Sequence, residues 1–515
     1  MGDGSDGSAE PGPTDNGDQM TAVGVSLFLL GIFCLPFVTH WREARRLGDV
    51  FFPLWLVAGR QIAEIVPRLA YVGLHPDDIE ARVRAHPSIT DMDATILWFG
   101  VVYALGFIAL LLGYSSGLGK AAASRLPLDT RQFTSRRYTI AALGSLALAL
   151  AIWAFGMHRR GGILAAVLTM GLKEVTGLQT QLVGGAYYNA CLFFFTSAFI
   201  MAIYAQKDSI RTSTKTLVAL VGAVAVLGYW SWGGRFQVFV GGAIGFLTWH
   251  YGVRRFRRFP TAMVSVALGA SVLFSMVTIA FRGSGVGAAR YLDDPSSFAR
   301  DVLASAPAAT KRFSPLDRYL LVVGYFTADK VWLGRSYLGL LTAPIPSAWW
   351  QDKPGGDDGL YLESIASGMD VTPPMPAWKT IKSSWPPLTF GIGYMNFWVP
   401  GVVAGMFLLG ACYRAAYDNM RRNSFSIHSV GLYGLTLLVL GFSNLEIILY
   451  LTRLAVFTIA YLLFLSLPDL LSRRTARATG LSCMGAVGRP GDAVDTNGGC
   501  SELAPRGARR LEHGA

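Results

Sequence analysis

The chain has 515 residues, of which 52% are hydrophobic and only 15% are charged. This composition, with a mean hydropathy of +0.40, excludes an assembly of soluble domains and indicates an integral membrane protein. Lys and Arg outnumber Asp and Glu by 45 to 33, which gives a net charge of +12. In a membrane protein this excess is typical of cytoplasmic loops, so we expect no nucleic-acid partner. The five cysteines form no CxxC pair, so neither a disulfide framework nor a zinc site is expected.

Apolar stretches long enough to cross a bilayer recur along the chain. A membrane helix needs about 20 predominantly apolar residues. Ten stretches bounded by charge meet this criterion, at residues 21–39, 93–115, 138–157, 187–206, 216–232, 236–252, 261–281, 396–413, 429–445 and 449–467. An eleventh, 50–73, carries Arg60, Glu64 and Arg68 on one helical face and either spans or lies in the interface. The predicted fold is an all-α polytopic membrane protein with about 10–12 transmembrane helices.

Short basic loops predict the orientation of these spans. Residues 116–137, 207–215, 253–258, 414–422 and 471–478 are rich in Lys and Arg, which places them in the cytoplasm. The alternate loops then face outward. The acidic first 20 residues and the basic residues 40–46 favour an outside N-terminus with eleven spans, and ten spans with an inside N-terminus is the alternative.

The chain therefore divides into five parts. We expect a disordered acidic tail, a transmembrane bundle, a large extracytoplasmic loop with amphipathic segments, the last transmembrane helices and a disordered basic cytoplasmic tail. Their bounds are 1–20, 21–281, 282–387, 388–470 and 471–515.

The long loop is rich in tryptophan. It holds Trp332, Trp349, Trp350, Trp378 and Trp385, and residues 319–341 form an amphipathic run. Such segments are typical of the headgroup level of a membrane, so we expect the loop to lie over the bundle.

Three arginines lie near predicted outward span ends. Arg235 follows a tight Gly-Gly turn, Arg282 follows the seventh span and Arg290 comes two turns later. An arginine at this depth costs a few kcal/mol unless an anion or a carbonyl cluster receives it. A diphosphate group would fit, because the guanidinium fork matches phosphate oxygens. The alternative is that these side chains extend to the interface without a ligand.

Metal motifs are weak in this sequence. Asp91 and Asp93 form the DxD pattern found in many glycosyltransferases, but they immediately precede a span and more simply cap its helix. The long loop contains no histidine. We therefore predict no metal site and no cofactor.

Particular motifs resemble the O-antigen polymerase (Wzy-type, oligosaccharide repeat unit polymerase) family. They are Gly334-Arg-Ser-Tyr337, Pro344-Ile-Pro346, Trp350-Gln-Asp-Lys353-Pro354 and the stretch from Pro386 to Gly401. Ten or more spans, the Gly-Arg turn at Arg235 and a long loop before the last three helices add to the likeness. The resemblance covers residues 21–470, with its diagnostic part at 335–405.

The resemblance implies a metal-independent, GT-C-like glycosyltransferase in the bacterial cytoplasmic membrane. It would polymerise undecaprenyl-diphosphate-linked oligosaccharide repeat units into surface polysaccharide on the outer face. Implied partners are these polyprenyl-diphosphate-linked oligosaccharides and membrane lipids, with a chain-length regulator and a flippase as candidates.

The same resemblance suggests roles for individual residues. The diphosphate ligands would be Arg235 and Arg282, followed by Arg290, Arg335 and Lys353. The candidate bases are Asp352, Asp357, Asp358 and Glu363, and spacing singles out none of them. The aromatic residues that would stack on sugars, or anchor the loop in the interface, are Tyr337, Trp349, Trp350, Tyr361 and Tyr394.

Three alternatives remain open from the sequence. A lipid-glycan ligase is less favoured because related ligases use a histidine in the long loop. A flippase for lipid-linked glycans would require broken helices and charges near the midplane. A polyprenyl-phosphate-sugar-dependent GT-C enzyme would gain support if 50–73 did not span, because Glu43 and Asp49 would then face outward.

Overall fold

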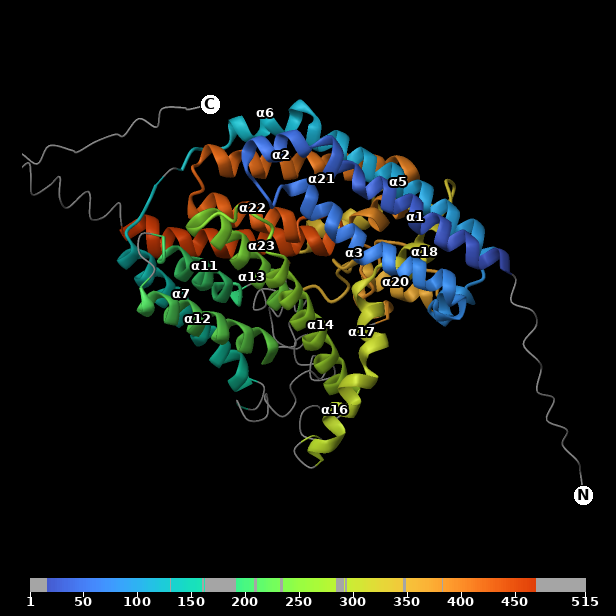
Figure 1. The fold of residues 1–515 in the computed structure, drawn as a ribbon. Coiled ribbons are helices and arrows are strands. Elements are labelled where there is room, and N and C mark those ends of the chain that lie inside the picture. Colours follow the sequence, from blue (N-terminus) through green and yellow to red (C-terminus); the bar gives the residue numbers. More distant parts are fainter. Residues whose placement is uncertain are drawn as a thin grey trace, which may run out of the picture. The chain divides into compact units, whose positions relative to one another are not determined.

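A computed structural model describes most of the chain. The described residues are 16–129, 131–159, 162, 191–207, 211–231, 235–283, 291, 294–345, 349–381 and 383–468. Within them the chain forms helices and no β-strand (Figure 1). Seven of these helices are long and apolar enough to cross a membrane. The prediction of an all-α polytopic membrane protein is confirmed at this level.

The seven long apolar helices match predicted spans. They are α1 (Asn16–Thr39), α5 (Met92–Ser115), α7 (Ser135–Arg159), α12 (Thr212–Ser231), α14 (Thr261–Gly283), α21 (Leu388–Arg422) and α23 (Asn444–Tyr461), which η7 (Leu462–Ser466) continues. Three further predicted spans contain shorter helices, namely α11 (Phe194–Tyr204), α13 (Arg235–Thr248) followed by the π-helical turn η3 (Trp249–Val253), and α22 (Ile427–Val439). The first four residues of predicted span 187–206 lie outside the described residues.

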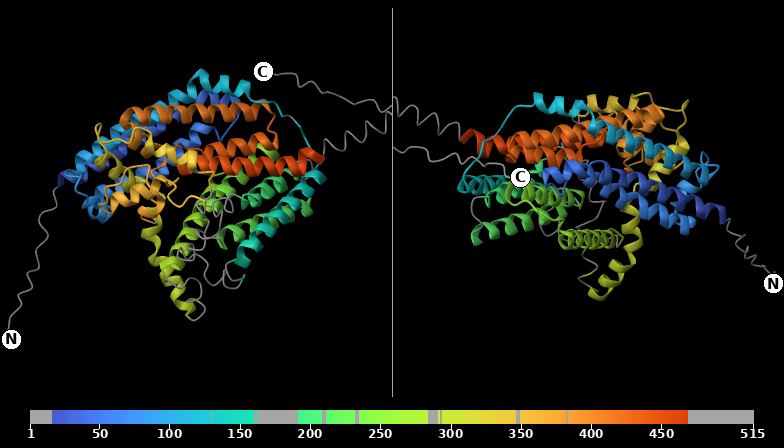
Figure 2. Two further views of the ribbon diagram at one scale, coloured as in Figure 1. Left: turned by 180° about the vertical axis from the view of Figure 1, so that it is seen from behind. Right: turned by 45° about the horizontal axis from the view of Figure 1, so that its top comes forward.

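The boundary between the last two helices differs from the prediction. Helix α23 begins at Asn444 rather than near residue 449, because Ser443 and Glu446 form a capping box there. Helices α22 and α23 lie side by side (Figures 1 and 2).

Helices α5 and α21 approach each other closely. A Cβ on Gly113 would overlap the carbonyl of Phe407, and one on Gly410 would overlap the carbonyl of Leu110. These glycines therefore let the two backbones touch, as small residues do in membrane helix pairs. Helix α21 is interrupted at Phe397 and Trp398, which have non-helical backbone angles.

Helix α3 (Pro53–Leu74) packs along α1 (Figure 1). Ser26 donates to the carbonyl of Val66 at 3.1 Å, and the indole of Trp55 donates to the carbonyl of Pro36 at 3.2 Å. At 1.5 Å per residue, 22 residues reach about 33 Å, enough to cross a bilayer core. Helix α3 is not among the seven apolar helices, and it carries the three charged residues Arg60, Glu64 and Arg68.

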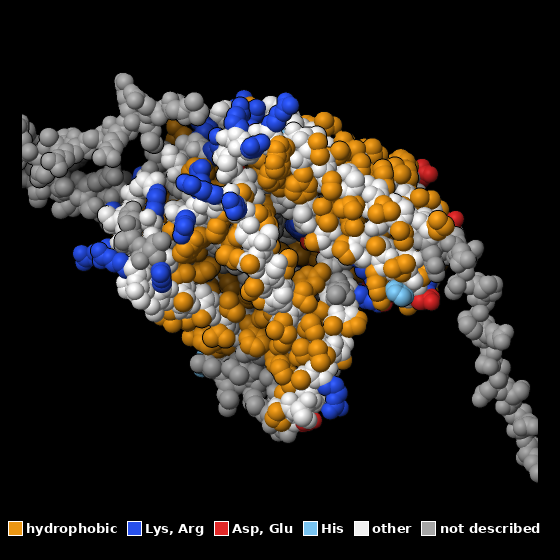
Figure 3. Space-filling view, viewed as in Figure 1, with side chains coloured by type: hydrophobic (Ala, Val, Ile, Leu, Met, Phe, Trp, Pro, Cys, Tyr) orange, Lys and Arg blue, Asp and Glu red, His pale blue; other side chains and the backbone are white. Residues whose placement is uncertain are grey.

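Four of the five predicted cytoplasmic segments have described residues at one end of α3, which we call the basic end, and the fifth, 471–478, lies outside the described residues. It comprises residues 40–49 with α2 (Trp41–Leu47), 117–129 with α6 (Gly117–Arg125), 204–207, 250–258 and 414–426. Arg414 pairs with Glu43 at 2.8 Å, and Tyr204 donates to the carbonyl of Phe425 at 2.7 Å. Lys and Arg side chains gather over α2 and α6 (Figure 3).

The other end of α3 meets the long loop, and we call it the loop end. Residues 75–91 lie there, with η1 (Pro76–Asp78) and α4 (Ala81–Arg84). Arg68 near this end of α3 pairs with Asp78 and, at 3.2 Å, with Asp317. Glu43 and Asp49 are thus separated from the long loop by the length of α3.

The long loop folds into short helices rather than one interfacial run. These are α16 (Pro295–Ala304), α17 (Ala306–Phe313), α18 (Leu316–Tyr325), η5 (Arg335–Tyr337), α19 (Leu338–Thr342), α20 (Asp358–Ala366) and η6 (Ala377–Lys379). Helix α18 was expected at the membrane surface, but it is buried against α5 and α21. Its Tyr319 ring packs against Phe390 at 4.8 Å, so apolar side chains on several of its faces enter the core.

Candidate functional site

The three outward arginines lie at or beyond the ends of described helices. Arg235 begins α13 and Arg282 lies in the last turn of α14, but their side chains lie outside the described residues. Arg290 lies outside them entirely. The shared diphosphate site of these arginines stays a prediction.

The loop carboxylates have different surroundings. Asp352 is exposed and accepts a hydrogen bond from the indole of Trp378 at 3.0 Å. Glu363 accepts from Arg82 at 2.7 Å, and the guanidinium of Arg82 also lies 4.1 Å from the ring centre of Trp385. The ion pair of Glu363 with Arg82 therefore links the segment before α5 to the long loop.

Asp357 and Asp358 lie at the start of α20. Asp357 caps this helix by accepting from the amide of Gly359, and burial raises its pKa. Asp358 is fully buried and accepts from the backbone amide of Asn444 at 2.7 Å and from its side chain at 3.0 Å. Asp358 thus ties the loop to the first turn of α23.

The predicted sugar-stacking tyrosines Tyr361 and Tyr394 are both 1% exposed. The Tyr361 hydroxyl donates to the carbonyl of Met375, and the Tyr394 hydroxyl accepts from the indoles of Trp98 and Trp398 at 2.7 and 2.8 Å. Their hydroxyls have protein partners and their rings are enclosed. In this structure the two tyrosines stabilise the fold, and neither presents a face to a sugar.

The remaining predicted ligands lie on or near the loop surface. Arg335 is exposed, Trp349 and Trp350 are 82% and 41% exposed, and Tyr337 is half-buried. The Lys353 ammonium donates to the carbonyls of loop residues 343 and 345, and burial lowers its pKa. Of these residues, Tyr337 lies close enough to Asp358 and Glu446 for electrostatic interaction.

The resemblance motifs do meet in space. The amide of Leu333 donates to the carbonyl of Asn396 at 2.9 Å, and the Asn396 side chain donates to Ser336 at 2.9 Å. Asn444 of α23 donates to the carbonyl of Ser336 at 2.6 Å. The segments around 334–337 and 386–401 are therefore joined at the start of α23.

Charged side chains of α3 face a cleft beside this junction. The Arg60 Nε atom donates to Glu64 Oε1 at 2.8 Å, and the two side chains are 45% and 24% exposed. Gln61 accepts from the hydroxyl of Tyr103 on α5, and Arg68 on the same face pairs with α18. This face of α3 points toward α5 and α18, and the Arg60 side chain on it is still 45% exposed. Charges in membrane helices commonly face the bundle interior or a water-filled cavity.

The opposite wall adds a second arginine and a second carboxylate. Arg318 on α18 donates to the carbonyl of Pro386 at 3.0 Å. Glu446 on α23 accepts through Oε2 from Ser443 at 3.0 Å and from Thr389 at 3.3 Å. Within the described part of the chain its Oε1 makes no hydrogen bond.

Tyrosines connect the two walls. The rings of Tyr103 and Tyr319 both lie 4.8 Å from Phe390, and Tyr319 interacts electrostatically with all four charged groups. Tyr413 on α21 interacts with Arg60, Glu64 and Glu446. We define the polar cleft as the residues Arg60, Gln61, Glu64, Tyr103, Arg318, Tyr319, Tyr413 and Glu446.

The surface is consistent with an open cleft. The face drawn in Figure 3 is hollowed near its centre, between α3 and α14, and charged atoms are visible inside the hollow. Two guanidinium groups in such a place can bind phosphate oxygens, and two carboxylates can accept a proton. Among the described residues, no group of three or more His, Cys, Asp or Glu could hold a metal ion.

One part of this cleft, the charged face of α3, has a signal in the sequence. The spacing of Arg60, Glu64 and Arg68 predicted one charged helical face, and interfacial placement was the alternative to spanning. Arg318 and Glu446 offered no local signal, because only the tertiary packing of α18 and α23 brings them to α3.

The chain matches no protein-family model, no curated protein and no solved structure.

Proposed function

We propose that this protein polymerises undecaprenyl-diphosphate-linked oligosaccharide units, and that the polar cleft is its catalytic site. The observation that carries the proposal is the meeting of two arginines and two carboxylates beside the joined segments 334–337 and 386–401. The proposed location is the bacterial cytoplasmic membrane, with the basic end inside and the loop end outside, as the distribution of Lys and Arg favours.

In the proposed reaction, Arg60 and Arg318 bind the diphosphate of the donor lipid. The bond between the anomeric carbon and the diphosphate oxygen breaks, and a hydroxyl oxygen of the acceptor sugar forms the new bond to that carbon. The two guanidinium groups stabilise the negative charge that develops on the leaving diphosphate.

Glu446 is the proposed base in this scheme. Its Oε2 atom is held by Ser443 and Thr389, and its Oε1 atom can accept the proton that the attacking hydroxyl loses. Glu64 positions Arg60 through their 2.8 Å ion pair.

The test is the length of the glycan made in cells. Arg60→Ala and Arg318→Ala, each expressed in a deletion strain, should abolish long chains and leave single repeat units on the lipid carrier. Arg235→Ala and Arg282→Ala test the arginines expected from the sequence. Arg300→Ala, on an exposed position of α16, is the matched control and should restore normal chains. Normal chain lengths in both cleft variants, at equal protein levels, would remove the cleft from the mechanism.

A second candidate is a transporter for lipid-linked glycans. The interruption of α21 at Phe397 and Trp398 favours it, because broken membrane helices commonly form transport sites. The two functions predict different products of deletion. Loss of a transporter traps lipid-linked units on the cytoplasmic face, whereas loss of a polymerase leaves them on the outer face.

A further inference from the structure

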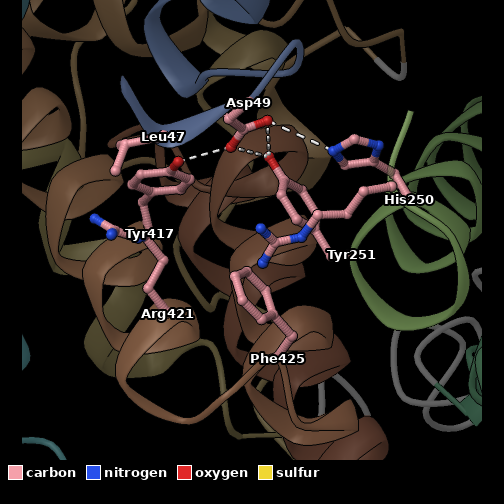
Figure 4. A pocket seen from close by; sticks show the side chains of 9 residues that line it. Leu47, Asp49, His250, Tyr251, Tyr417, Arg421 and Phe425 are labelled. Carbon is pink, nitrogen blue, oxygen red and sulfur yellow. Dashed lines mark hydrogen bonds and ion pairs between the residues drawn. The ribbon is translucent and has the colours of Figure 1, made fainter. Parts of the chain in front are cut away.

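A pocket of about 180 Å³ lies at the basic end, away from the polar cleft (Figure 4). It forms where the turn after α2 meets η3 and the last turns of α21. Its lining residues are Leu47, Gly48, Asp49, His250, Tyr251, Arg255, Tyr417, Arg421 and Phe425.

The floor of the pocket is a carboxylate whose hydrogen bonds are complete. Asp49 accepts from Tyr417 at 2.6 Å, from Tyr251 at 2.9 Å and from the amide of Phe51 at 3.0 Å. His250 Nε2 lies 3.5 Å from the same carboxylate. Asp49 therefore has little remaining capacity to bind a cation.

The ring of His250 is oriented by the backbone of the following loop. The amide of Phe256 donates to its Nδ1 atom at 3.1 Å, so Nδ1 carries a lone pair and the ring proton is assigned to Nε2, facing Asp49. The ring edge that carries Nε2 therefore faces the carboxylate of Asp49.

The mouth of the pocket presents two guanidinium groups. Arg255 lies 4.1 Å from the ring centre of Phe425, and Arg421 lies 5.9 Å from that of Tyr417. Both side chains are exposed, and neither has an ion-pair partner within the described part of the chain. Stacking on the aromatic rings restricts the orientation of the two guanidinium planes. The N–H groups at the edges of these planes remain available to an anion.

The charged groups that line the pocket suit a ligand with a single negative charge. One carboxylate and two guanidinium groups leave a single positive charge, which one phosphodiester balances. We propose that this pocket binds the phosphodiester of a membrane-lipid headgroup, with the phosphate between Arg255 and Arg421. Basic pockets between membrane helices are suited to this class of ligand. A soluble phosphate shares the same chemistry, and the experiment separates the two sources.

The test uses the full chain purified in detergent. Thermal unfolding is measured with phosphatidylglycerol, with phosphatidylcholine and with inorganic phosphate, and retained lipids are counted by native mass spectrometry. The test variant is Arg255→Gln with Arg421→Gln. The matched control is Arg257→Gln with Arg258→Gln, which removes the same charge from the loop that carries Arg255, at positions outside the pocket.

The proposal predicts that phospholipid raises the unfolding temperature of the wild type and the control. The test variant should bind that lipid at least about tenfold more weakly, the loss expected when charge-assisted hydrogen bonds are removed. An equal effect of inorganic phosphate alone would overturn the lipid source in favour of a soluble phosphate. Equal lipid retention by the test variant and the control would overturn the site itself.

Because the test variant could change folding, Arg421→Lys provides a second readout. It keeps the charge but loses the planar fork, so lipid affinity should fall while the unfolding temperature without lipid stays unchanged. Unchanged lipid affinity in Arg421→Lys would contradict bidentate binding at Arg421.

Discussion

Asp358 is the buried carboxylate that joins the long loop to the bundle. Burial raises its pKa to about 7, the hydrogen bond from the amide of Asn444 opposes this effect, and the negative charges of Asp357 and Glu446 add to it. In the unfolded chain its pKa returns to the ordinary value of 3.8. The folded protein therefore binds the proton more tightly than the unfolded chain does.

This difference predicts a pH dependence of stability. The contribution of Asp358 is complete below its unfolded pKa, falls as the pH rises toward 7, and stays low above that. The wild type should unfold at a higher temperature at pH 5 than at pH 8. Asp358→Asn, which cannot titrate, should show a smaller difference, measured by thermal unfolding in detergent. An identical pH dependence in wild type and variant would contradict the role given to Asp358.

Gly441 tests the position of the proposed base without changing that base. A Cβ at Gly441 would overlap the Glu446 carboxylate, so Gly441→Ala must displace it. We expect the rate of chain extension to fall at least about tenfold at equal protein level, since a displaced base loses much of its contribution to general-base catalysis. Gly405→Ala is the matched control, because its nearest neighbours are 3.9 and 4.0 Å away. Full activity in Gly441→Ala would argue against Glu446 as the base.

Single residues were only partly predictable from the sequence. The charged face of α3 was visible in the spacing of Arg60 and Glu64, because helical periodicity is a local property. The burial of Tyr361 and Tyr394 was not, because an aromatic ring in an amphipathic loop has the same local pattern whether it faces a sugar or the core. Which arginine meets which carboxylate depends on contacts between distant parts of the chain.

Helix α3 is the element whose assignment decides the topology. It connects the basic end to the loop end. Because it carries three charged residues, the sequence alone left open whether it spans the membrane or lies in the interface. The ion pair of Arg60 with Glu64 and those of Arg68 reduce the cost of these charges in a spanning position. With 22 residues, α3 is long enough to cross a bilayer core between residues 49 and 75.

Cysteine labelling from each side of the membrane tests this crossing. In a background with the five native cysteines replaced by serine, Arg45→Cys and Asp77→Cys place exposed thiols at the two ends of α3. Arg45→Cys should label with the basic-loop reference Arg257→Cys, and Asp77→Cys with the loop reference Lys379→Cys. Labelling of positions 45 and 77 from the same side would show that α3 does not cross.

Hydropathy predicted the apolar helices, because burial in lipid requires about 20 apolar residues. It did not predict where α23 begins, since the capping box at Ser443 and Glu446 decides that boundary. It also missed the burial of α18, which is too short to span but fills a gap between α5 and α21.

At the scale of the whole molecule, the account depends on contacts between segments far apart in sequence. Arg60 and Glu446 are brought near each other by packing of α3, α18, α21 and α23, and their charges interact. No local pattern encodes this arrangement. The class of protein followed from composition, whereas the cleft required the tertiary structure.

Reconstitution of the purified protein in liposomes with undecaprenyl-diphosphate-linked oligosaccharide tests the central claim most directly. The measured quantities are the length of the lipid-linked glycan and the release of undecaprenyl diphosphate. The account predicts a ladder of chains with the wild type, and single units only with Arg60→Ala or Arg318→Ala. Transfer of the lipid-linked units across the membrane without any chain growth by the wild type would contradict it.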